Sequence, residues 1–320
     1  MKAFRGKILV IRGGAIGDFI LTLPALAALR RRFPEARLEV LGYPHIVSLA
    51  LAGGLADEVH SIEARSLAGF FARGGQLAEE LADYFAEFDL IVSYLYDPDE
   101  IFEENVGRCT GAQFIIGPYR ADERARLHAS KVYLKPLERL AIFEADPVPR
   151  LALNSSLPAL NQIALHPGSG SENKNWPEAN WAKLLHHLTD ATGFDLLLIG
   201  GEAEGERVQR LAAAAPSVRL KVVQNLPLPN LAGRLQPCAG FIGHDSGISH
   251  LAAAVGLRGL VLWGDTTEEV WRPPSEQVTV LRHPGGLASL PVSAVVQWLD
   301  SDLGKGIAFR GAVGLRLARP

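Results

Sequence analysis

The chemistry that this chain could perform is concentrated in four loops that combine glycine with carboxylate, lysine or hydroxyl side chains. The most informative loop spans residues 244–250, has Asp-Ser-Gly at its centre and precedes the small, apolar run 251–256. Because it follows the apolar segment 239–243, it is predicted to turn from a strand into a helix. Free backbone N–H groups and the helix dipole favour bound phosphate at such a turn. An ordinary helix cap is the alternative, since Asp and Ser are common N-cap residues.

A second loop, residues 12–18, delivers the carboxylate of Asp18 to the first turn of a predicted helix. A dinucleotide-binding fingerprint would need glycine where this chain has Arg12, and an acidic residue after the second strand, which ends without one. A P-loop is also excluded, because no Gly-Lys-Ser/Thr follows. Asp18 is interpreted either as a carboxylate that stabilises the helix dipole or as a general base facing a cleft.

The second half of the chain adds candidate groups for a diphosphate and for sugar hydroxyls. Residues 166–177 follow a strand-like segment and carry Lys174 shortly before a helix expected to begin near Pro177 or Glu178. A lysine there could neutralise a diphosphate, or be a solvated surface residue. Residues 200–206 place Glu202 after another strand, where it could accept hydrogen bonds from hydroxyls or belong to an ordinary helix N-terminus.

Two further side chains belong to the last of the four loops and its continuation. His250 lies one turn into the helix, where its ring could reach a ligand oxygen or cap polar groups of the core. Thr266 begins a loop after another strand, and its hydroxyl alone is not diagnostic. None of the four loops contains an Asp-x-Asp pair of the kind that binds metal, so we expect no metal.

The composition indicates a globular protein with two domains. The 320 residues are 48% hydrophobic and 21% charged, and the formal net charge of −3 gives no support for nucleic-acid binding. Cys109 and Cys238 lie in unrelated segments, which indicates neither a disulfide framework nor a zinc site and fits a reducing cytoplasm. No run is long enough for a signal peptide or a membrane span.

Strand-like and helical patterns alternate along the chain, which is typical of parallel, doubly wound α/β sheets. A break rich in turn-forming residues, 146–158, separates the two halves. We predict an N-terminal domain of residues 1–153 and a C-terminal domain of residues 154–320, with ligands bound beyond the carboxyl ends of the strands. Residues 304–320 are either a tail or pack back on the first domain. The predicted strands are 8–11, 37–41, 90–94, 162–166, 194–200, 220–223, 240–242, 259–263 and 278–281.

Taken together, these loops resemble the glycosyltransferase family of bacterial ADP-heptose:lipopolysaccharide heptosyltransferases, family 9 of that classification. Four stretches, residues 14–24, 166–177, 200–202 and 245–266, carry the match in the family's order. Ser246 stands where the family commonly has threonine, which preserves the hydroxyl. The resemblance implies a GT-B architecture, in which two Rossmann-like doubly wound domains face a central cleft. The N-terminal domain would hold the acceptor and the C-terminal domain the nucleotide sugar.

The resemblance also implies a role for individual residues. Asp18 would be the catalytic base that deprotonates an acceptor hydroxyl in an inverting, metal-independent transfer without a cofactor. The acceptor-side loop would comprise Gly14 and Gly17, with Arg120 nearby. The implied donor-binding residues are Lys174, Glu202, Asp245, Ser246, Gly247, His250 and Thr266.

The implied partners are a nucleotide sugar, expected to be ADP-heptose, and a lipopolysaccharide inner-core or other glycan acceptor. The protein would then lie in the cytoplasm or peripherally on the cytoplasmic face of the inner membrane. Residues 67–73 form an apolar patch that could contact this membrane, although burial against the sheet is favoured. Basic residues could bind an acidic acceptor or be ordinary surface residues. These are Arg120, Arg124, Arg126 and Lys131.

Three alternative functions stay open at this point. The chain could be a family-related transferase that uses another nucleotide sugar. It could be a GT-B sugar-nucleotide epimerase, which would need further acid and base groups and no acceptor. It could also be a catalytically silent nucleotide-sugar-binding scaffold, although such a scaffold has no need for Asp18.

Overall fold

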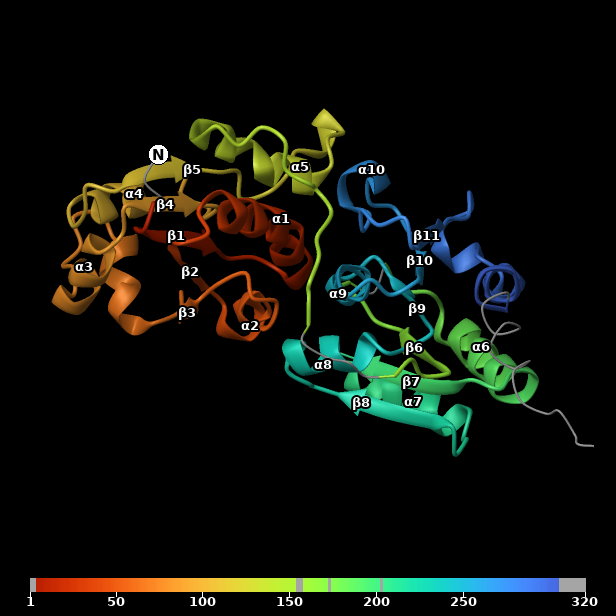
Figure 1. Cartoon of the computed structure of the whole chain (residues 1–320). Helices are drawn as coiled ribbons and strands as arrows, with labels where there is room; N and C mark the ends of the chain where they lie inside the picture. The colour runs from red at the N-terminus through yellow and green to blue at the C-terminus, as the bar shows by residue number, and fades with distance from the viewer. Residues whose placement is uncertain (1–3, 154–157, 172–173, 202–203, 305–320) are drawn as a thin grey trace, which may run out of the picture.

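A computed structural model describes residues 4–153, 158–171, 174–201 and 204–304 of the chain. Within these residues, two parallel sheets lie side by side, each covered by helices on both faces (Figure 1). This arrangement confirms the predicted GT-B class of two doubly wound, Rossmann-like units. The predicted domain boundary falls next to residues outside the described part of the chain and stays a prediction.

The first sheet has five parallel strands in the order β3-β2-β1-β4-β5. The central strands are apolar and fully buried because helices cover both faces of the sheet. Strand order reverses between β1 and β4, and loops at such a switch point are where open α/β sheets bind ligands. The strands are β1 (Lys7–Arg12), β2 (Arg37–Gly42), β3 (Glu58–Ser61), β4 (Leu90–Ser93) and β5 (Gln113–Ile116).

Helix α1 is buried around most of its circumference, from Phe19 to Leu29. A helix that is apolar on nearly all sides must be covered on nearly all sides. Here its own sheet, helix α5 and helix α9 of the other half provide that cover. The helices of this half are α1 (Ile16–Arg32), α2 (Pro44–Ala52), α3 (Glu79–Ala86), α4 (Ile101–Gly107) and α5 (Ala129–Leu134), with 3-10 helices η1 (Arg65–Phe71), η2 (Glu123–Ala125) and η3 (Lys135–Leu140).

The second sheet has six parallel strands in the order β11-β10-β9-β6-β7-β8, so its switch point lies between β6 and β9. The alternating sequence pattern therefore identified the right elements, including a helix that begins at Glu178. The strands are β6 (Gln162–His166), β7 (Asp195–Gly200), β8 (Leu220–Gln224), β9 (Gly240–His244), β10 (Gly259–Leu262) and β11 (Val278–Leu281). The helices are α6 (Glu178–Ala191), α7 (Gly205–Ala214), α8 (Leu228–Leu235), α9 (Gly247–Ala254), α10 (Glu268–Trp271) and α11 (Val292–Trp298), with η5 (Leu287–Ser289) and the π-helical turn η6 (Leu299–Leu303).

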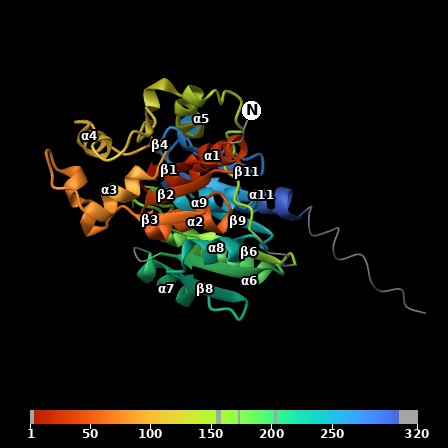
Figure 2. The same ribbon diagram turned by 60° about the vertical axis from the view of Figure 1, so that its left-hand side comes forward.

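The two halves contact each other directly along α1 and α9 and along α2 and α8 (Figure 2). The closest approach joins the N-terminal ends of α1 and α9, where a Cβ added to Gly247 would lie 2.6 Å from Cβ of Ile16. Glycine is therefore required at position 247 by the neighbouring helix rather than by its own backbone conformation. The connecting segment crosses back beside α9, where the Leu151 N–H donates to the Ala254 carbonyl at 2.8 Å.

The sequence left two interpretations for the apolar segment 67–73, namely contact with a membrane and burial against the sheet. Leu67 and Phe70 are buried in a cluster with Phe85 and Phe102, which supports the interpretation as core. Phe71, in contrast, is 44% exposed. Residues 305–320 lie outside the described part of the chain, so the two alternatives for the C-terminal stretch stay predictions.

Candidate functional site

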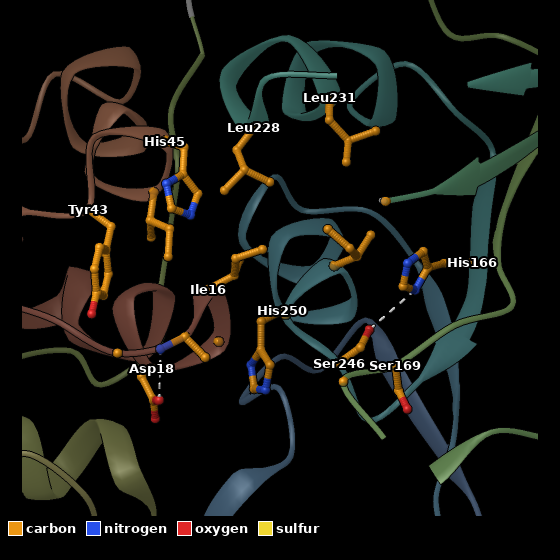
Figure 3. Close-up of a pocket in the computed structure, with 18 of the residues that line it drawn as sticks. Ile16, Asp18, Tyr43, His45, His166, Ser169, Leu228, Leu231, Ser246 and His250 are labelled. Carbon is orange, nitrogen blue, oxygen red and sulfur yellow. Dashed lines mark hydrogen bonds between the residues drawn. The ribbon is translucent and has the colours of Figure 1, made fainter. Parts of the chain in front are cut away.

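A cavity of about 1340 Å³ lies between the two halves, at the carboxyl ends of both sheets (Figure 3). Loops that follow strands line it, as expected for ligand sites in open parallel sheets. Glu202 lies outside the described residues. The other residues implied for the donor and for the acceptor-side loop all line this cavity: Gly14, Gly17, Asp18, Arg120, Lys174, Asp245, Ser246, Gly247, His250 and Thr266. Three basic residues considered for an acidic acceptor do not line it: Arg124, Arg126 and Lys131.

Asp18 reaches the cavity from the first turn of α1 and is held by three neighbours. Its Oδ2 accepts a hydrogen bond from the Ala15 N–H at 3.3 Å, and its Oδ1 accepts one from the Tyr133 hydroxyl at 3.4 Å. The buried Arg12 guanidinium lies 3.8 Å from Oδ1. The side chain is 29% exposed, so this carboxylate is fixed in place and still open to a substrate.

Gly14 is the position in this loop that needs glycine for its backbone, because its φ is +96°. A Cβ there would also lie 3.3 Å from Asp18 Oδ2. The glycine therefore permits the turn that aims the carboxylate and leaves the carboxylate uncovered. Gly17 faces the other half, where an added Cβ would lie 3.3 Å from Cδ2 of His250.

The turn between β9 and α9 presents the N-terminus of a helix to the cavity. Ser246 is its N-cap, and the hydroxyl accepts a hydrogen bond from the Ser249 N–H at 3.4 Å. Among the described residues, no hydrogen bond is formed by the N–H groups of Gly247 and Ile248. These groups and the helix dipole make this end of α9 suited to an anion.

Lys174, Asp245 and Thr266 form one polar group beside this turn. Lys174 Nζ lies 2.7 Å from Asp245 Oδ2, and the Thr266 hydroxyl donates to the same oxygen at 2.7 Å. Asp245 Oδ2 therefore joins the lysine and the threonine, which come from two different loops. The Lys174 side chain stays 36% exposed, which leaves its ammonium available to a ligand.

Two buried histidines complete the floor of the cavity. His250 lies between the α1 and α9 N-termini, and its Nδ1 makes no hydrogen bond within the described residues. Nδ1 of His166, at the end of β6, is 3.4 Å from the Ser246 hydroxyl. The sequence placed His166 at a strand end but did not single it out. Arg12 and Tyr133 were also missed as partners of Asp18, although Arg12 ends a predicted strand.

One part of the cavity wall, contributed by the C-terminal half, is apolar. It is formed by side chains from the carboxyl ends of β7 and β8, from the loop after β8 and from the first turns of α8. Glu204, the N-cap of α7, accepts a hydrogen bond from the Gly201 N–H at 3.0 Å and is the described acidic residue of this loop. The apolar lining comprises Ile199, Val223, Leu226, Leu228 and Leu231.

Contacts between the two halves also border the cavity near Arg120 and Trp271. Thr267 donates from its hydroxyl to Glu123 at 2.7 Å, and the Trp271 indole N–H donates to the same carboxylate at 2.9 Å. The Arg120 guanidinium lies 3.5 Å from Glu123 and 5.6 Å from the Trp271 ring centroid. No local pattern in the sequence could have paired residues 148 positions apart.

His244 fixes the loop that carries Lys174. Its Nε2 accepts hydrogen bonds from the Trp176 N–H at 2.8 Å and from the Trp181 indole N–H at 3.4 Å. The other ring nitrogen must then carry the proton, and it donates to the Gly168 carbonyl at 3.3 Å. This neutral ring joins both ends of the loop 168–176 to β9.

Acid is expected to destabilise the fold through these histidines. Burial lowers the pKa of His166 and His250 to about 4 and that of His244 to about 3. In the unfolded chain they titrate near pH 6.5, so below that pH the unfolded state binds protons that the folded state does not. Each histidine should therefore cost roughly 1 kcal/mol of unfolding free energy per pH unit as the pH falls from about 6.5 to 5.

Urea unfolding measured at several pH values across this window tests the expectation. Carboxylates stay ionised in both states down to about pH 5, so the slope reports mainly on histidines. The His250→Asn variant should show a shallower slope than the parent protein. An unfolding free energy that does not change between about pH 7 and 5 would contradict the assignment.

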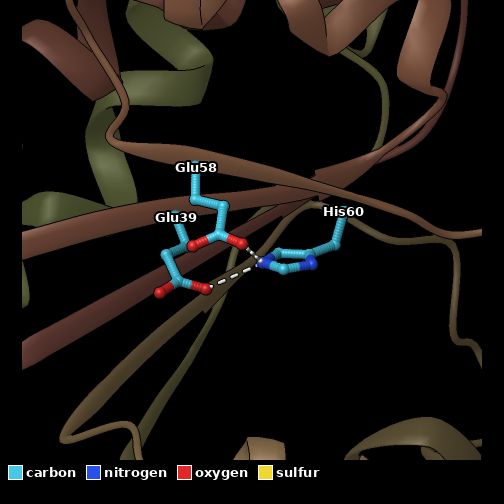
Figure 4. A group of neighbouring side chains, drawn as sticks. All are labelled: Glu39, Glu58 and His60. Atoms are coloured by element: carbon cyan, nitrogen blue, oxygen red, sulfur yellow. Dashed lines mark hydrogen bonds and ion pairs between the residues drawn. The ribbon is translucent and has the colours of Figure 1, made fainter.

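A separate cluster of Glu39, Glu58 and His60 could offer three atoms to a cation (Figure 4). His60 Nε2 lies 3.0 Å from Glu39 and 3.5 Å from Glu58. Arg37 Nε already lies 2.7 Å from Glu39, and Lys7 Nζ is 3.7 Å from it. None of these residues lines the central cavity. We interpret the cluster as an ion-pair network of β2 and β3.

The Asp-x-Asp sequences of this chain lie outside the four loops. Asp97 and Asp99 follow β4, and Asp97 accepts hydrogen bonds from the N–H groups of Phe102 and Glu103 at 3.1 and 3.0 Å. This carboxylate therefore caps helix α4. Asp300 and Asp302 belong to the turn η6, after α11.

Comparisons with known proteins support the same family. A family model described as glycosyltransferase family 9 (heptosyltransferase) matches residues 145–289. Lipopolysaccharide heptosyltransferase 3 of Escherichia coli is 22% identical over 296 residues, which cover 82% of this chain and 84% of that protein. Residues 145–289 are thus similar to family 9 of the glycosyltransferases. The resemblance inferred from the four loops is thereby confirmed.

Two solved structures have a similar fold over nearly the whole chain. The Escherichia coli ADP-heptose lipopolysaccharide heptosyltransferase II matches with a TM-score of 0.77 at 18% identity, covering 94% of this chain and 99% of that one. The Escherichia coli heptosyltransferase WaaC with ADP matches with a TM-score of 0.73 at 20% identity, covering 92% and 99%. Among the described residues, no helix has the length and apolar character needed to cross a bilayer.

Proposed function

We propose that this glycosyltransferase moves heptose from ADP-heptose to a hydroxyl of a lipopolysaccharide inner-core acceptor, with inversion and without a metal ion. The observation that carries the proposal is the position of Asp18 opposite the α9 N-terminus and Lys174 around one cavity. The N-terminal half would hold the acceptor and the C-terminal half the donor. The structural neighbour WaaC was solved with ADP, which favours an adenine nucleotide.

The proposed reaction begins at Asp18, which takes the proton from the acceptor hydroxyl as its oxygen attacks the anomeric carbon. The bond from that carbon to the diphosphate breaks on the opposite face. Asp18 projects from the N-terminal half and the anion-binding turn from the C-terminal half, so base and leaving group face each other. Attack from the side opposite the leaving group inverts the configuration.

The departing diphosphate would be stabilised by groups that are already in place. The N–H groups of Gly247 and Ile248 point their partial positive charge into the cavity, and Lys174 adds a full charge. Asp245 holds the lysine and is itself held by the Thr266 hydroxyl, so little reorganisation is needed when charge develops. This set of donors supplies the charge that a divalent ion supplies in metal-dependent transferases, which supports metal independence.

Calorimetric titration with ADP and ADP-heptose, with and without magnesium, tests the donor assignment. Replacing Lys174 by alanine should weaken ADP binding roughly 10- to 100-fold, because a hydrogen bond to a charged group is lost. Lys183→Ala, which removes an exposed lysine of α6, is the matched control and should bind ADP normally. The double variant Lys174→Ala/Asp245→Asn should also bind ADP weakly.

Three results would count against the donor site. Normal ADP affinity in the double variant would mean that Lys174 only neutralises Asp245. Absence of nucleotide binding by the parent protein would remove the donor assignment. Preference for another nucleotide would contradict ADP-heptose as the donor but would leave the fold and the role of Asp18 as catalytic base untouched.

A further inference from the structure

A second cavity, of about 420 Å³, lies at the switch point of the first sheet, beside the loop that carries Asp18. Its volume lies within the range of ligand pockets, roughly 300–1,000 Å³. It opens into the central cavity, since Gly14, Tyr43, Glu63 and Tyr119 line both. Segments that follow all five strands contribute to its wall: Arg12–Gly14, Tyr43, Ile62–Glu63, Tyr94–Tyr96 and Tyr119.

The wall of this cavity is aromatic and unusually open to solvent. Tyr96 is 63% exposed and Tyr119 50% exposed, and their ring centroids are 4.5 Å apart at an interplanar angle of 62°. Phe71 completes the wall from η1, and Tyr43 stands beside the Asp18 loop (Figure 3). Large aromatic side chains gathered in an exposed hollow indicate a binding surface. Their rings can stack on the C–H faces of a sugar while their hydroxyls bond to its hydroxyls.

The charges around this cavity argue against an anionic ligand. The one cationic side chain in the described wall, Arg12, is 1% exposed and faces the backbone carbonyls of Tyr94 and Tyr119 as well as Asp18. Glu63 lies on the rim, and the loop after Tyr96 continues with acidic residues. A carboxylate or phosphate placed here would meet negative charge without an accessible counter-charge.

We propose that this second cavity binds an uncharged sugar ring of the acceptor, next to the ring whose hydroxyl is activated by Asp18. The inference rests on the proposed function, because it assumes that a glycan enters the cavity beside Asp18. The basic residues of the N-terminal half had suggested an acidic acceptor. The proposal adds a neutral, aromatic subsite to the same half. Arg120 lies outside this subsite, on the central cavity, and can still meet an acidic group elsewhere in the acceptor.

Saturation-transfer NMR without any donor tests the subsite. The neutral probes are the methyl glycosides of glucose, galactose and mannose, and the charged probe is the methyl glycoside of glucuronic acid. We expect binding of at least one neutral glycoside, with glucuronide binding weaker. The double variant Tyr96→Ala/Tyr119→Ala should weaken this binding roughly tenfold, because two stacking rings are removed. Phe143→Ala, which removes an aromatic side chain that lines neither cavity, should change nothing.

Several outcomes would overturn the proposal. The glucuronide could bind as tightly as the neutral glycosides or more tightly. The protein could transfer no saturation to any sugar. The double variant could also bind the sugars as well as the parent protein does. Saturation of 1-hexanol but of no sugar would assign the cavity to an acyl chain. Calorimetry with ADP is independent of this experiment, so failure of the donor site and failure of the sugar subsite are distinguishable. A near-native melting temperature of the double variant confirms that it folds.

Discussion

Replacing Asp18 with asparagine is expected to lower kcat roughly 10²- to 10⁴-fold while ADP binding stays unchanged. Asparagine has the same shape and can still accept the hydrogen bond from the Ala15 N–H, so the first turn of α1 should persist. It cannot take a proton from the acceptor hydroxyl. The loss should therefore appear in kcat, measured by release of the nucleoside diphosphate at saturating donor and acceptor, rather than in donor affinity.

Glu178→Gln is the matched control for this variant. Glu178 also lies in the first turn of a helix, but it faces Arg210 at 2.9 Å and not the cavity. Its replacement should leave kcat within about twofold of the parent value. Retention of more than about a tenth of the activity by Asp18→Asn would exclude Asp18 as the base and leave it as a residue that stabilises the helix N-terminus.

Replacing Gly247 with alanine is expected to reduce kcat/KM roughly 5- to 150-fold. This range is the usual free-energy cost of an overpacked methyl group, about 1–3 kcal/mol, expressed as a ratio. The added Cβ would lie 2.6 Å from Cβ of Ile16 and 3.1 Å from the Gly17 nitrogen. These atoms belong to the backbone-proximal part of α1 and cannot swing aside. The N-termini of α1 and α9 must then separate, which moves Asp18 away from the donor turn.

Gly233→Ala is a suitable control for this substitution, because it lies in α8 and an added Cβ would meet no atom within 4 Å. It should leave kcat/KM unchanged. The effect of Gly247→Ala should also appear in small-angle X-ray scattering as a larger radius of gyration. An active Gly247→Ala enzyme with unchanged dimensions would show that the contact between the two helices does not set the distance between base and donor.

The sequence was sufficient to predict the features that depend on short stretches of chain. Alternating apolar runs predicted all six strands of the second sheet and the three central strands of the first, but missed its edge strands β3 and β5. Most of the proposed site residues followed a predicted strand, and parallel strands end at a common edge. The position of Asp18 in the first turn of a helix followed from the glycines before it. Helix α6 begins at Glu178, as Pro177 suggested.

The remaining features depend on how the two sheets are placed, which no local pattern encodes. The 2.7 Å contact between Lys174 and Asp245 needs two loops 71 positions apart, and the bonds from Thr267 and Trp271 to Glu123 join opposite halves. The sequence placed Asp245 in the donor-binding set but could not show that its carboxylate contacts Lys174 and Thr266. Phe71 appeared as part of one apolar patch because exposure of a single ring depends on its neighbours in space.

The meeting of α1 and α9 at their N-terminal ends has an electrostatic consequence. Each helix N-terminus carries roughly half a positive charge, and two such ends in contact repel each other. Asp18 offsets part of this repulsion from its place in the first turn of α1. An anion placed between the helices removes more of it, so approach of the two halves and retention of a nucleoside diphosphate are thermodynamically linked. Under the proposed function, departure of the diphosphate product would restore the repulsion, so the two dipoles that favour donor binding would also favour separation of the two halves.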